Sequence, residues 1–389
     1  PMSRIITKTV WMLSLVSLFT DMASEMLYPV MPLFLRDIGF SIALIGVLEG
    51  VAEATAGLSK GYFGQLSDIT GRRLPFVQWG YALSALSKPL MAISTQAWWI
   101  FTVRTTDRLG KGLRTAARDA LLSAEATAET KAQVFGLHRA MDTTGAFIGP
   151  ALALLFLFLY PGQYNLLFMI ALFPGLAAIT LTLLLKEKPL PAKAQATSMT
   201  SFIAWWKSAP QAYRQVVGGL LAFALINSSD VFLLLRARDS GLGDTTIIGL
   251  YIGYNLVYAA LAYPVGLLAD RWGTQRTLVF GLLLFAGVYA GFGWANDILW
   301  FGLLLAVYGS YAACTESIAK AWITNLVQKD QTATAIGTYT AFQSVATLFA
   351  STAAGIIWYA GGATMLFATT GMIALVLAIY FSQLKIARQ

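Results

Sequence analysis

Charged residues are scarce in this sequence, and so are the side chains on which most enzyme and metal chemistry depends. Only 12% of the 389 residues are Asp, Glu, Lys or Arg, against about 25% in soluble domains. The single cysteine, Cys314, excludes a disulfide framework and a CxxC metal site. The sequence also lacks a GxxxxGK[ST] phosphate loop, an HExxH and a GxSxG. We therefore expect no ATP hydrolysis, no resident metal or cofactor, and no enzymatic activity.

Apolar residues, by contrast, make up 57% of the chain, and the mean hydropathy is +0.65. They occur in long runs separated by turn residues and charges, which is typical of membrane-spanning helices. At roughly 30 residues per span and connection, such a chain holds about twelve spans. We therefore predict an all-α polytopic protein of the cell membrane. The predicted spans are 10–35, 42–66, 75–95, 97–121, 133–159, 164–186, 213–236, 245–269, 277–295, 298–325, 333–358 and 363–384.

The net charge of +8 fits this interpretation better than it fits a nucleic-acid binder. A nucleic-acid binder carries Lys and Arg on a soluble face, and the sequence predicts no soluble domain. Lys and Arg instead gather in alternate connections, such as Arg72 and Arg73 after the second span and Arg271 and Arg276 after the eighth. Because cytoplasmic loops carry such an excess, we expect both termini in the cytoplasm, and membrane lipid rather than nucleic acid as a partner.

The longest predicted connection, residues 187–212, divides the chain into two parts. Pro189, Pro191 and an Ala/Lys-rich composition are typical of a linker. Residues 201–207 could form a short helix at the membrane surface, with Trp205 and Trp206 at the depth of the lipid headgroups. We predict a six-helix bundle in residues 1–186 and a second one in residues 213–389.

The two predicted bundles contain related sequences at a nearly constant offset. Residues 36–39 (RDIG) return as 238–241 (RDSG), and residues 64–68 (GQLSD) return as 266–270 (GLLAD), each displaced by 202 positions. Gly136 returns as Gly337, displaced by 201. Three coincidences at nearly one offset indicate an internal duplication of six helices.

A charged turn repeated in both bundles resembles the loop motif of the major facilitator superfamily. The residues that match this motif and its second copy are Gly64, Asp68, Gly71, Arg72 and Arg73, and then Gly266, Asp270 and Arg271. Gly71 permits a tight reversal, and Asp68 can cap a helix or pair with an arginine. The resemblance implies a secondary transporter that works by alternating access, often as a monomer. In the family this motif latches the cytoplasmic side in the outward-facing state.

A second motif lies in the fifth predicted span, where Gly145, Gly149 and Pro150 resemble the GxxxGP signature of the family's antiporters. Two glycines four residues apart clear one helix face for close packing, and the proline bends the helix. The family pattern usually continues with a glycine pair, whereas Ala151 follows here. The resemblance implies export of a drug or another small organic molecule by antiport.

Residues 99–122 begin like a membrane helix and then carry seven charged side chains. A charge inside a bilayer is unfavourable and marks a functional position. We expect Arg104 and Arg108, in the outer part of this span, to face the central cavity. There they could pair with carboxylates of the first span or clamp an anionic substrate. Arg114 and Arg118 fall near the cytoplasmic end, and we expect them to belong to a gate.

Two pairs of carboxylates lie one helical turn apart and so share a helix face: Asp21 with Glu25, and Glu49 with Glu53. In a cavity of low dielectric constant such groups can exchange protons near neutral pH, and we expect them to couple proton flow to transport. The alternative is that cations such as Lys88 hold these carboxylates ionised and inert.

The single histidine, His138, lies four residues before Asp142, so the two share a helix face in the fifth span. An imidazole that titrates near neutral pH suits a proton relay. A hydrogen-bonded histidine in the protein core is the alternative.

The second bundle is poor in charge. Glu316 aligns with Arg114 at the 202 offset, and this exchange of sign could form a gate across the two bundles. We expect the first bundle to carry the protons and the second to supply a polar and aromatic wall for the substrate. The candidate residues of this second wall are Asn227, Asp230, Tyr254, Glu316 and Gln343.

The leading functional prediction is export of a small organic molecule in exchange for protons, with protons as the coupling ion. The first alternative is proton-coupled uptake or exchange of an organic anion held by Arg104 and Arg108. The second is transport of a transition metal. The candidate ligands for such a metal are Asp21, Met22, Glu25, Met26, His138 and Asp142.

Overall fold

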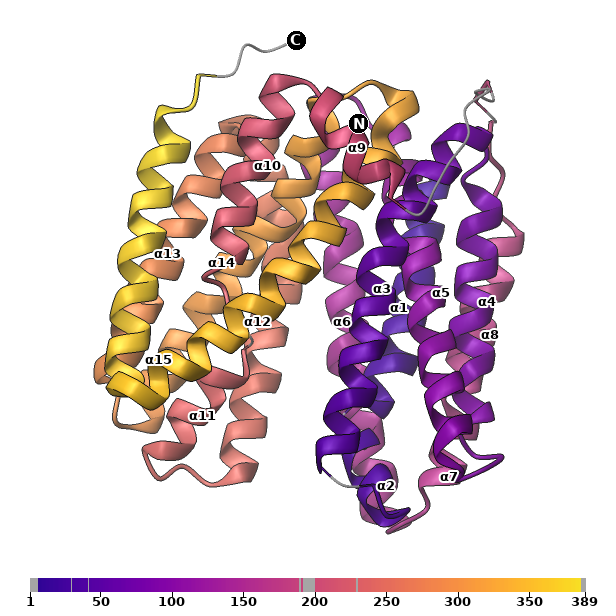
Figure 1. Ribbon diagram of the computed structural model, residues 1–389, viewed down its shortest axis with the longest axis vertical. Helices are drawn as coiled ribbons and strands as arrows, with labels where there is room; N and C mark the ends of the chain where they lie inside the picture. Colours follow the sequence, from indigo (N-terminus) through magenta and orange to yellow (C-terminus); the bar gives the residue numbers. More distant parts are fainter. Residues whose placement is uncertain are drawn as a thin grey trace. The chain divides into compact units, whose positions relative to one another are not determined.

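The computed structural model is all-helical over the residues that it describes, which are 6–28, 30–40, 42–188, 190–191, 200–228 and 230–385 (Figure 1). The helices before the long connection are α1 (Lys8–Leu27), α2 (Met31–Asp37), α3 (Ile42–Thr70), α4 (Leu74–Leu90), α5 (Ala97–Ala124), α6 (Lys131–Leu159), α7 (Tyr164–Ile170) and α8 (Leu172–Leu183). The later ones are α9 (Ser201–Ser208), α10 (Gln211–Ala224), α11 (Val231–Asp239), α12 (Asp244–Trp272), α13 (Thr274–Trp294), α14 (Ile298–Asn325) and α15 (Thr332–Gln383).

Three of the predicted spans are divided, which corrects the predicted continuous helices 10–35, 164–186 and 213–236. In the first, α1 ends at Leu27, two residues before a proline in the sequence. In the second, Pro174 near the start of α8 has no backbone N–H, so it cannot continue the series of helix hydrogen bonds from α7. In the third, α10 ends before Asn227 and Ser228, two residue types that disfavour the interior of a helix. The predicted break between the last two spans is a kink in α15 at Gly362, where φ is +78°.

Seven helical segments in the described part of the chain are long and apolar enough to cross a membrane. They are Lys8–Leu27, Lys131–Leu159, Tyr164–Leu183, Gly249–Trp272, Thr274–Trp294, Ile298–Asn325 and Lys329–Gln383. Helix α5 falls outside this set because charged side chains interrupt its apolar sequence.

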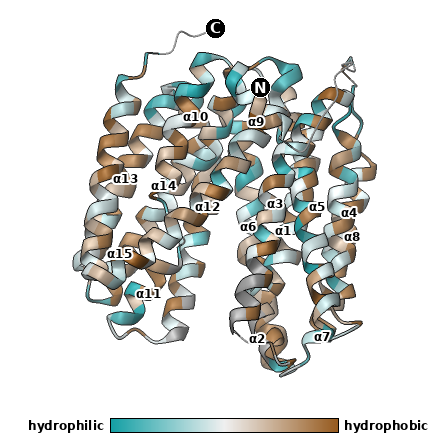
Figure 2. Ribbon diagram, viewed as in Figure 1, coloured by the Kyte–Doolittle hydropathy of each residue, from teal (hydrophilic) through white to brown (hydrophobic). Residues whose placement is uncertain are grey.

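Hydrophobic residues follow one another along α8 and α13 (Figure 2), and large apolar side chains remain exposed on several helices. Phe158 and Leu299 each keep 81% of their surface exposed, and Trp79 keeps 68%. A soluble protein rarely leaves such side chains uncovered. These faces therefore suit contact with lipid, in agreement with a multi-pass membrane protein.

The chain forms two compact units that do not follow the chain order throughout. The first unit comprises Pro1–Ala126, Met141–Ser208 and Gln328–Ala341, and the second comprises Thr127–Ala140, Ala209–Val327 and Phe342–Gln389. Helix α6 therefore begins in the second unit and ends in the first, and α15 begins in the first unit and ends in the second. In the first unit α5 packs between α3 and α4, and in the second unit α14 packs against α12 and α13 (Figure 1).

The predicted internal duplication is visible in the backbone. All six glycines with positive φ among the described residues form pairs at almost the same offset. The pairs are Gly39 with Gly241, Gly71 with Gly273, and Gly162 with Gly362. Only glycine adopts this backbone conformation without strain, so the same reversals occur at matching places in both repeats.

Candidate functional site

Charged side chains line a cavity of about 60 Å³ between α1, α4 and α5 of the first unit. Such a volume holds a few water molecules or one small polar group. The structure thus brings the charged residues of α5 together with two carboxylates of α1 around one cavity. The charged residues around the cavity are Asp21, Glu25, Lys88, Arg104, Asp107, Arg108, Lys111 and Arg114.

Asp107 of α5 is the central carboxylate of this cavity. Its Oδ1 lies 3.4 Å from Lys88 Nζ on α4, and its Oδ2 lies 3.5 Å from Arg104 Nη1. Lys88 is 5% exposed and also donates a hydrogen bond to the carbonyl oxygen of Ser84 at 2.8 Å. Sequence reasoning gave neither Lys88 nor Asp107 a site role. A lysine beside Pro89 in an apolar span could have indicated one, since buried ionisable residues in membranes are usually functional.

The α5 arginines have carboxylate partners other than the α1 carboxylates that the sequence suggested as one possibility. Among the residues that the structure describes, no ion pair joins Arg104 or Arg108 to Asp21 or Glu25. Arg108 Nη1 instead lies 3.4 Å from Glu53 Oε1 on α3. The turns of α5 determine which residues share a face, but helix packing brings α3 to that face. The side chain of Glu49 lies outside the described part of the structure.

Arg114 and Arg118, predicted as gate residues, lie in different environments. Arg114 lines the cavity, where its Nη1 donates to Ser84 Oγ at 2.6 Å and its guanidinium lies 4.5 Å from the Tyr81 ring. Arg118 forms a buried ion pair with Asp119 at 2.8 Å. Arg118 Nη1 also lies 3.4 Å from the Tyr81 hydroxyl. Arg114 therefore lines the cavity, and the gate role of both residues stays a prediction.

Asp21 and Asp142 form a carboxyl pair where α1 crosses α6. The two carboxyl groups lie close enough to interact electrostatically, and the Ser17 hydroxyl donates a hydrogen bond to Asp142 Oδ1. Two neighbouring carboxyl groups repel each other when both are ionised, which favours a proton on one of them. Asp142 is 8% exposed, whereas Asp21 reaches the cavity. This pair can therefore hold a proton beside the charged cavity.

The glycine motif of α6 makes this crossing possible. A Cβ at Gly145 would collide with the carbonyl oxygen of Leu18, and a Cβ at Gly149 would lie 2.5 Å from that of Met22. Both carbonyls belong to α1, and Pro150 follows within α6. The sequence prediction that the two glycines clear one helix face is thus confirmed.

His138 and Asp142 lie on the same helix, but in different units. His138 is 4% exposed in the second unit, while Asp142 belongs to the carboxyl pair of the first. Within the described ranges, no three His, Cys, Asp or Glu residues lie close enough to hold a metal ion. The geometry thus gives no support to the predicted metal transport.

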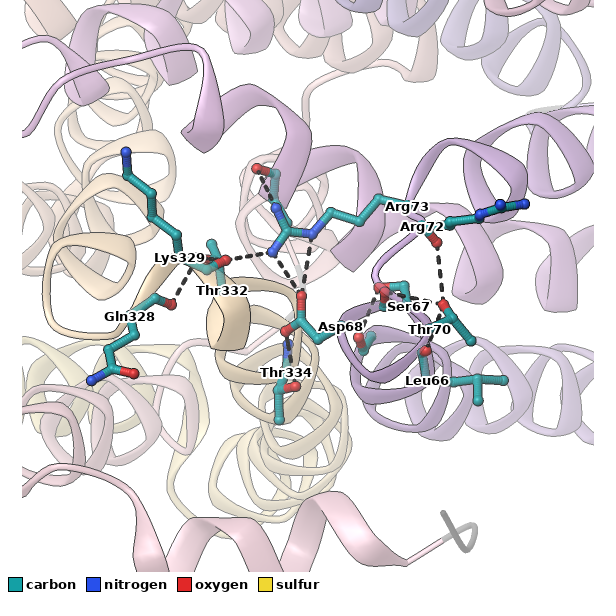
Figure 3. A network of polar contacts seen from close by, with 12 residues as sticks. Leu66, Ser67, Asp68, Thr70, Arg72, Arg73, Gln328, Lys329, Thr332 and Thr334 are labelled. Carbon is teal, nitrogen blue, oxygen red and sulfur yellow. Dashed lines mark hydrogen bonds and ion pairs between the residues drawn. The ribbon is translucent and has the colours of Figure 1, made fainter. Parts of the chain in front are cut away.

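Asp68 occupies the centre of the first loop motif (Figure 3). Its Oδ1 lies 2.7 Å from Arg73 Nη2, and both side chains are buried. Its Oδ2 accepts hydrogen bonds from the backbone N–H of Thr334 at 2.7 Å and from its hydroxyl at 2.9 Å. Arg73 also donates to the carbonyl oxygen of Lys329 at 2.6 Å. Asp68 therefore both caps α15 and pairs with an arginine, the two roles that the sequence predicted as alternatives.

The turn of the first motif is closed by the beginning of the long connection. Glu187 accepts hydrogen bonds from the backbone N–H groups of Arg73 and Leu74 at 2.8 Å each, and so caps α4. Gly71 has a φ of +68°, and its carbonyl oxygen accepts a hydrogen bond from Leu190 at 2.9 Å. Arg72 is exposed and points away from this network (Figure 3).

The second copy of the motif repeats the cap but not the ion pair. Asp270 accepts hydrogen bonds from the backbone N–H groups of Ala132 at 3.0 Å and Gln133 at 2.9 Å, at the start of α6. A Cβ at Gly266 would lie 2.5 Å from the carbonyl oxygen of Ala132. In the first unit, a Cβ at Gly64 would likewise lie 2.5 Å from the carbonyl oxygen of Ala333. Arg271 is exposed.

The second unit contains a cluster of tyrosines around Asp230. The Tyr308 hydroxyl donates to Asp230 Oδ1 at 2.7 Å. Tyr254 lies 5.3 Å from Tyr308, ring to ring, and Asn227 donates to the Tyr311 hydroxyl at 3.1 Å. The structure thus gathers these predicted residues in one unit. Gln343 is half-buried in the same unit.

Glu316 has a partner that sequence reasoning did not predict. Its Oε2 lies 2.5 Å from Arg139 Nη2, and Arg139 Nε donates to the Tyr258 hydroxyl at 2.5 Å. Glu316 belongs to the second unit and Arg114 to the first, and the gate between them stays a prediction.

Comparison with known proteins supports the fold and the broad function. The sequence matches the family described as Major Facilitator Superfamily over residues 13–243 and again over 216–386. An uncharacterised MFS-type transporter of Methanocaldococcus jannaschii is 32% identical, with 91% of this chain and 89% of that protein covered. A homologue of the multi-drug resistance efflux pump PmrA from Lactococcus lactis is 22% identical, with 75% and 73% covered.

Two solved structures have the same fold. The human organic anion transporter MFSD10 aligns with a TM-score of 0.79 and 16% identity over 98% of this chain and 99% of that one. The fucose:proton symporter FucP of E. coli aligns with a TM-score of 0.81 and 14% identity over 98% and 100%. At such low identity these structures show the fold and leave the substrate open.

Proposed function

Because the chain belongs to the Major Facilitator Superfamily, we propose that it exports a small organic molecule in exchange for protons by alternating access. The protein is a multi-pass transporter of the cell membrane and not an enzyme. The proton-coupled exchange is the part that we propose from the site.

A twelve-span arrangement with both termini in the cytoplasm is part of this proposal. The last of the seven long apolar segments contains two spans if α15 crosses the membrane once on each side of Gly362, which gives eight spans. Helices α3, α4 and α5 and the pair α10–α11 add the other four. Helix α9 would then lie at the cytoplasmic surface within the linker 187–212. It is anchored by Phe202, which packs on Gly61 of α3, and by a hydrogen bond from Ser201 to Gln65.

The carboxyl pair of Asp21 and Asp142 is the observation that carries the proton coupling. It lies where α1 crosses α6, and Asp21 also reaches the cavity that holds Lys88 and Asp107. Loss of the shared proton leaves two negative charges at one helix crossing, which favours a different packing of the two helices. Proton binding and helix movement are coupled in this way, as alternating access requires.

We propose export as the direction because of the α6 glycines and the efflux-pump relative. Gly145 and Gly149 place the antiporter-type motif directly against the α1 segment that carries Asp21. The PmrA homologue is named as a multi-drug efflux pump. Exchange predicts that substrate and protons move in opposite directions.

Replacement of Asp21 or Asp142 by asparagine is expected to lower proton-driven transport at least about tenfold, because an amide cannot release a proton near neutral pH. The measurement uses proteoliposomes with imposed pH gradients, and ethidium and fluorescein as cationic and anionic dyes. The matched control is Asp37→Asn, since Asp37 is exposed on α2. If the D21N and D142N variants respond to the gradient like the wild type, the proposed coupling is wrong.

Transport of an organic anion is a second candidate, which one observation favours. Five cationic side chains but only three carboxylates line the cavity. The proposed clamp of Arg104 and Arg108 is weakened, however, because each already has a carboxylate partner. In the same proteoliposomes, exchange predicts dye accumulation when the interior is acidic. An anion that moves together with protons accumulates when the exterior is acidic, with voltage held at zero.

A further inference from the structure

Arg114 is the one cavity arginine for which the structure shows no carboxylate partner among the described residues. It is 4% exposed, and its Nε has no hydrogen-bond partner. Arg104 has Asp107 within 3.5 Å, and Arg108 has Glu53 within 3.4 Å. A buried guanidinium without a carboxylate in direct contact is unfavourable in a membrane protein, so its retention favours an anion from elsewhere.

We propose that Arg114 binds the carboxylate group of the transported molecule, and that this molecule is an amphipathic organic carboxylate. The inference rests on the proposed transporter function and applies to either direction of transport. It assigns the anion to Arg114 instead of Arg104 and Arg108.

The Arg114 side chain is held in place by two α4 residues. Nη1 donates to Ser84 Oγ at 2.6 Å, and the guanidinium lies against the Tyr81 ring at 4.5 Å. Ser84 Oγ in turn donates to the backbone carbonyl oxygen of Asp107 at 3.0 Å, which orients the hydroxyl. A guanidinium positioned in this way loses little conformational entropy when it binds a planar anion.

The charge around the cavity favours a single anionic group. Lys88 and Arg104 share one carboxylate, Asp107, and Lys111, which also lines the cavity, adds another positive charge. A carboxylate bound at Arg114 would supply the negative charge that these cationic side chains lack. The guanidinium can hold this carboxylate through two parallel N–H···O bonds. The volume of about 60 Å³ suits such a head group.

The lining of the cavity is partly apolar. Leu27, Met31, Met91 and Val103 line it together with the charged residues. These side chains provide apolar contact for the rest of the ligand, and methionine adapts easily to different shapes. A small, highly hydrophilic anion would leave these apolar side chains without a partner, whereas an aromatic or aliphatic carboxylate contacts both the charged and the apolar lining.

Thermal unfolding of the purified full-length protein with benzoate tests the proposal. Benzoate joins one carboxylate to an apolar ring, and benzamide has nearly the same shape without the charge. We expect benzoate to raise the unfolding temperature in a saturable way and benzamide to have no effect. Arg114→Gln is expected to weaken benzoate binding at least about tenfold. Arg114→Lys keeps the charge but loses the two-bond geometry, and should give an intermediate affinity.

The control is Arg214→Gln, because Arg214 is exposed on α10 in the second unit and its loss removes the same charge. It should keep the wild-type response. Without ligand, R114Q should unfold no earlier than the wild type, since the substitution removes an unpaired buried charge. A purely structural role for Arg114 predicts a lower unfolding temperature instead.

Three results would overturn the assignment: no response of the wild type to benzoate up to about 10 mM, an equal response to benzamide, or unchanged benzoate affinity in R114Q. If R114Q does not fold, unchanged affinity in R114K overturns it equally. A failure of the transporter function would look different. Benzoate binding would still depend on Arg114, while the dyes in proteoliposomes would not move.

Discussion

Replacement of Asp68 by alanine is expected to be the most damaging single substitution in the chain. It leaves Arg73 buried with only the carbonyl oxygens of Lys329 and Ala120 as partners. Breaking one side of a buried ion pair costs about 3–5 kcal/mol. Loss of the cap on the backbone N–H of Thr334 adds about 1 kcal/mol. We therefore expect the unfolding temperature in detergent to fall by several degrees and dye transport to be lost.

The internal duplication offers a matched control in Asp270→Ala. Asp270 caps α6 through Ala132 and Gln133 but pairs with no arginine among the described residues. Its loss should therefore cost only the capping energy, about 1 kcal/mol. Asp68→Asn should destabilise the protein less than Asp68→Ala and more than Asp270→Ala. The amide oxygen can still accept a hydrogen bond from Thr334, but it carries no charge to pair with Arg73. Equal destabilisation by D68A and D270A would contradict the importance of the Arg73 pair.

A methyl group at Gly145 or Gly149 is expected to have the second largest effect. In Gly145→Ala the new Cβ meets the carbonyl oxygen of Leu18, and in Gly149→Ala that of Met22. Neither helix backbone can move without separating α1 from α6. Such overpacking costs about 1–3 kcal/mol. The separation also pulls Asp21 away from Asp142, so proton-driven transport should fall more than stability does.

Gly287→Ala is the control for these two variants. Gly287 lies in the middle of α13, and a Cβ there would meet no atom within 4 Å. Alanine should therefore be neutral there or stabilise the helix by about 0.5–1 kcal/mol. Unfolding temperatures and the pH dependence of dye transport are measured for all three proteins. If G145A and G149A behave like G287A, close α1–α6 packing has no role in coupling.

Local sequence patterns predicted most of the fold. Apolar runs located the helices, and a repeat displaced by about 202 positions located the duplication, which reappears in the paired reversals at Gly71 and Gly273. Prolines and polar residues inside three predicted spans divided them into shorter helices. The prolines and polar residues are visible in the sequence, but the long apolar runs around them predict continuous helices. The breaks were therefore not predicted.

The candidate site could be predicted only in part. Spacing along a helix showed that Asp21 and Glu25 share one helix face. It also showed that Gly145 and Gly149 lie on one face of their helix, where they permit close packing of another helix. Glu53 as the partner of Arg108, and Lys88 as that of Asp107, depend on which helix lies opposite, and spacing along a helix contains no such information.

The charged stretch of α5 shows this division between sequence and tertiary structure most clearly. By itself, the sequence determined that α5 is a helix with too many charges for a lipid-facing span, and that its arginines must face a polar environment. Tertiary packing alone decided that Arg108 pairs with Glu53 and that Arg114 has no carboxylate partner among the described residues. A charged side chain inside a membrane protein is stabilised by polar groups within a few ångströms. Helix packing determines which groups lie that close.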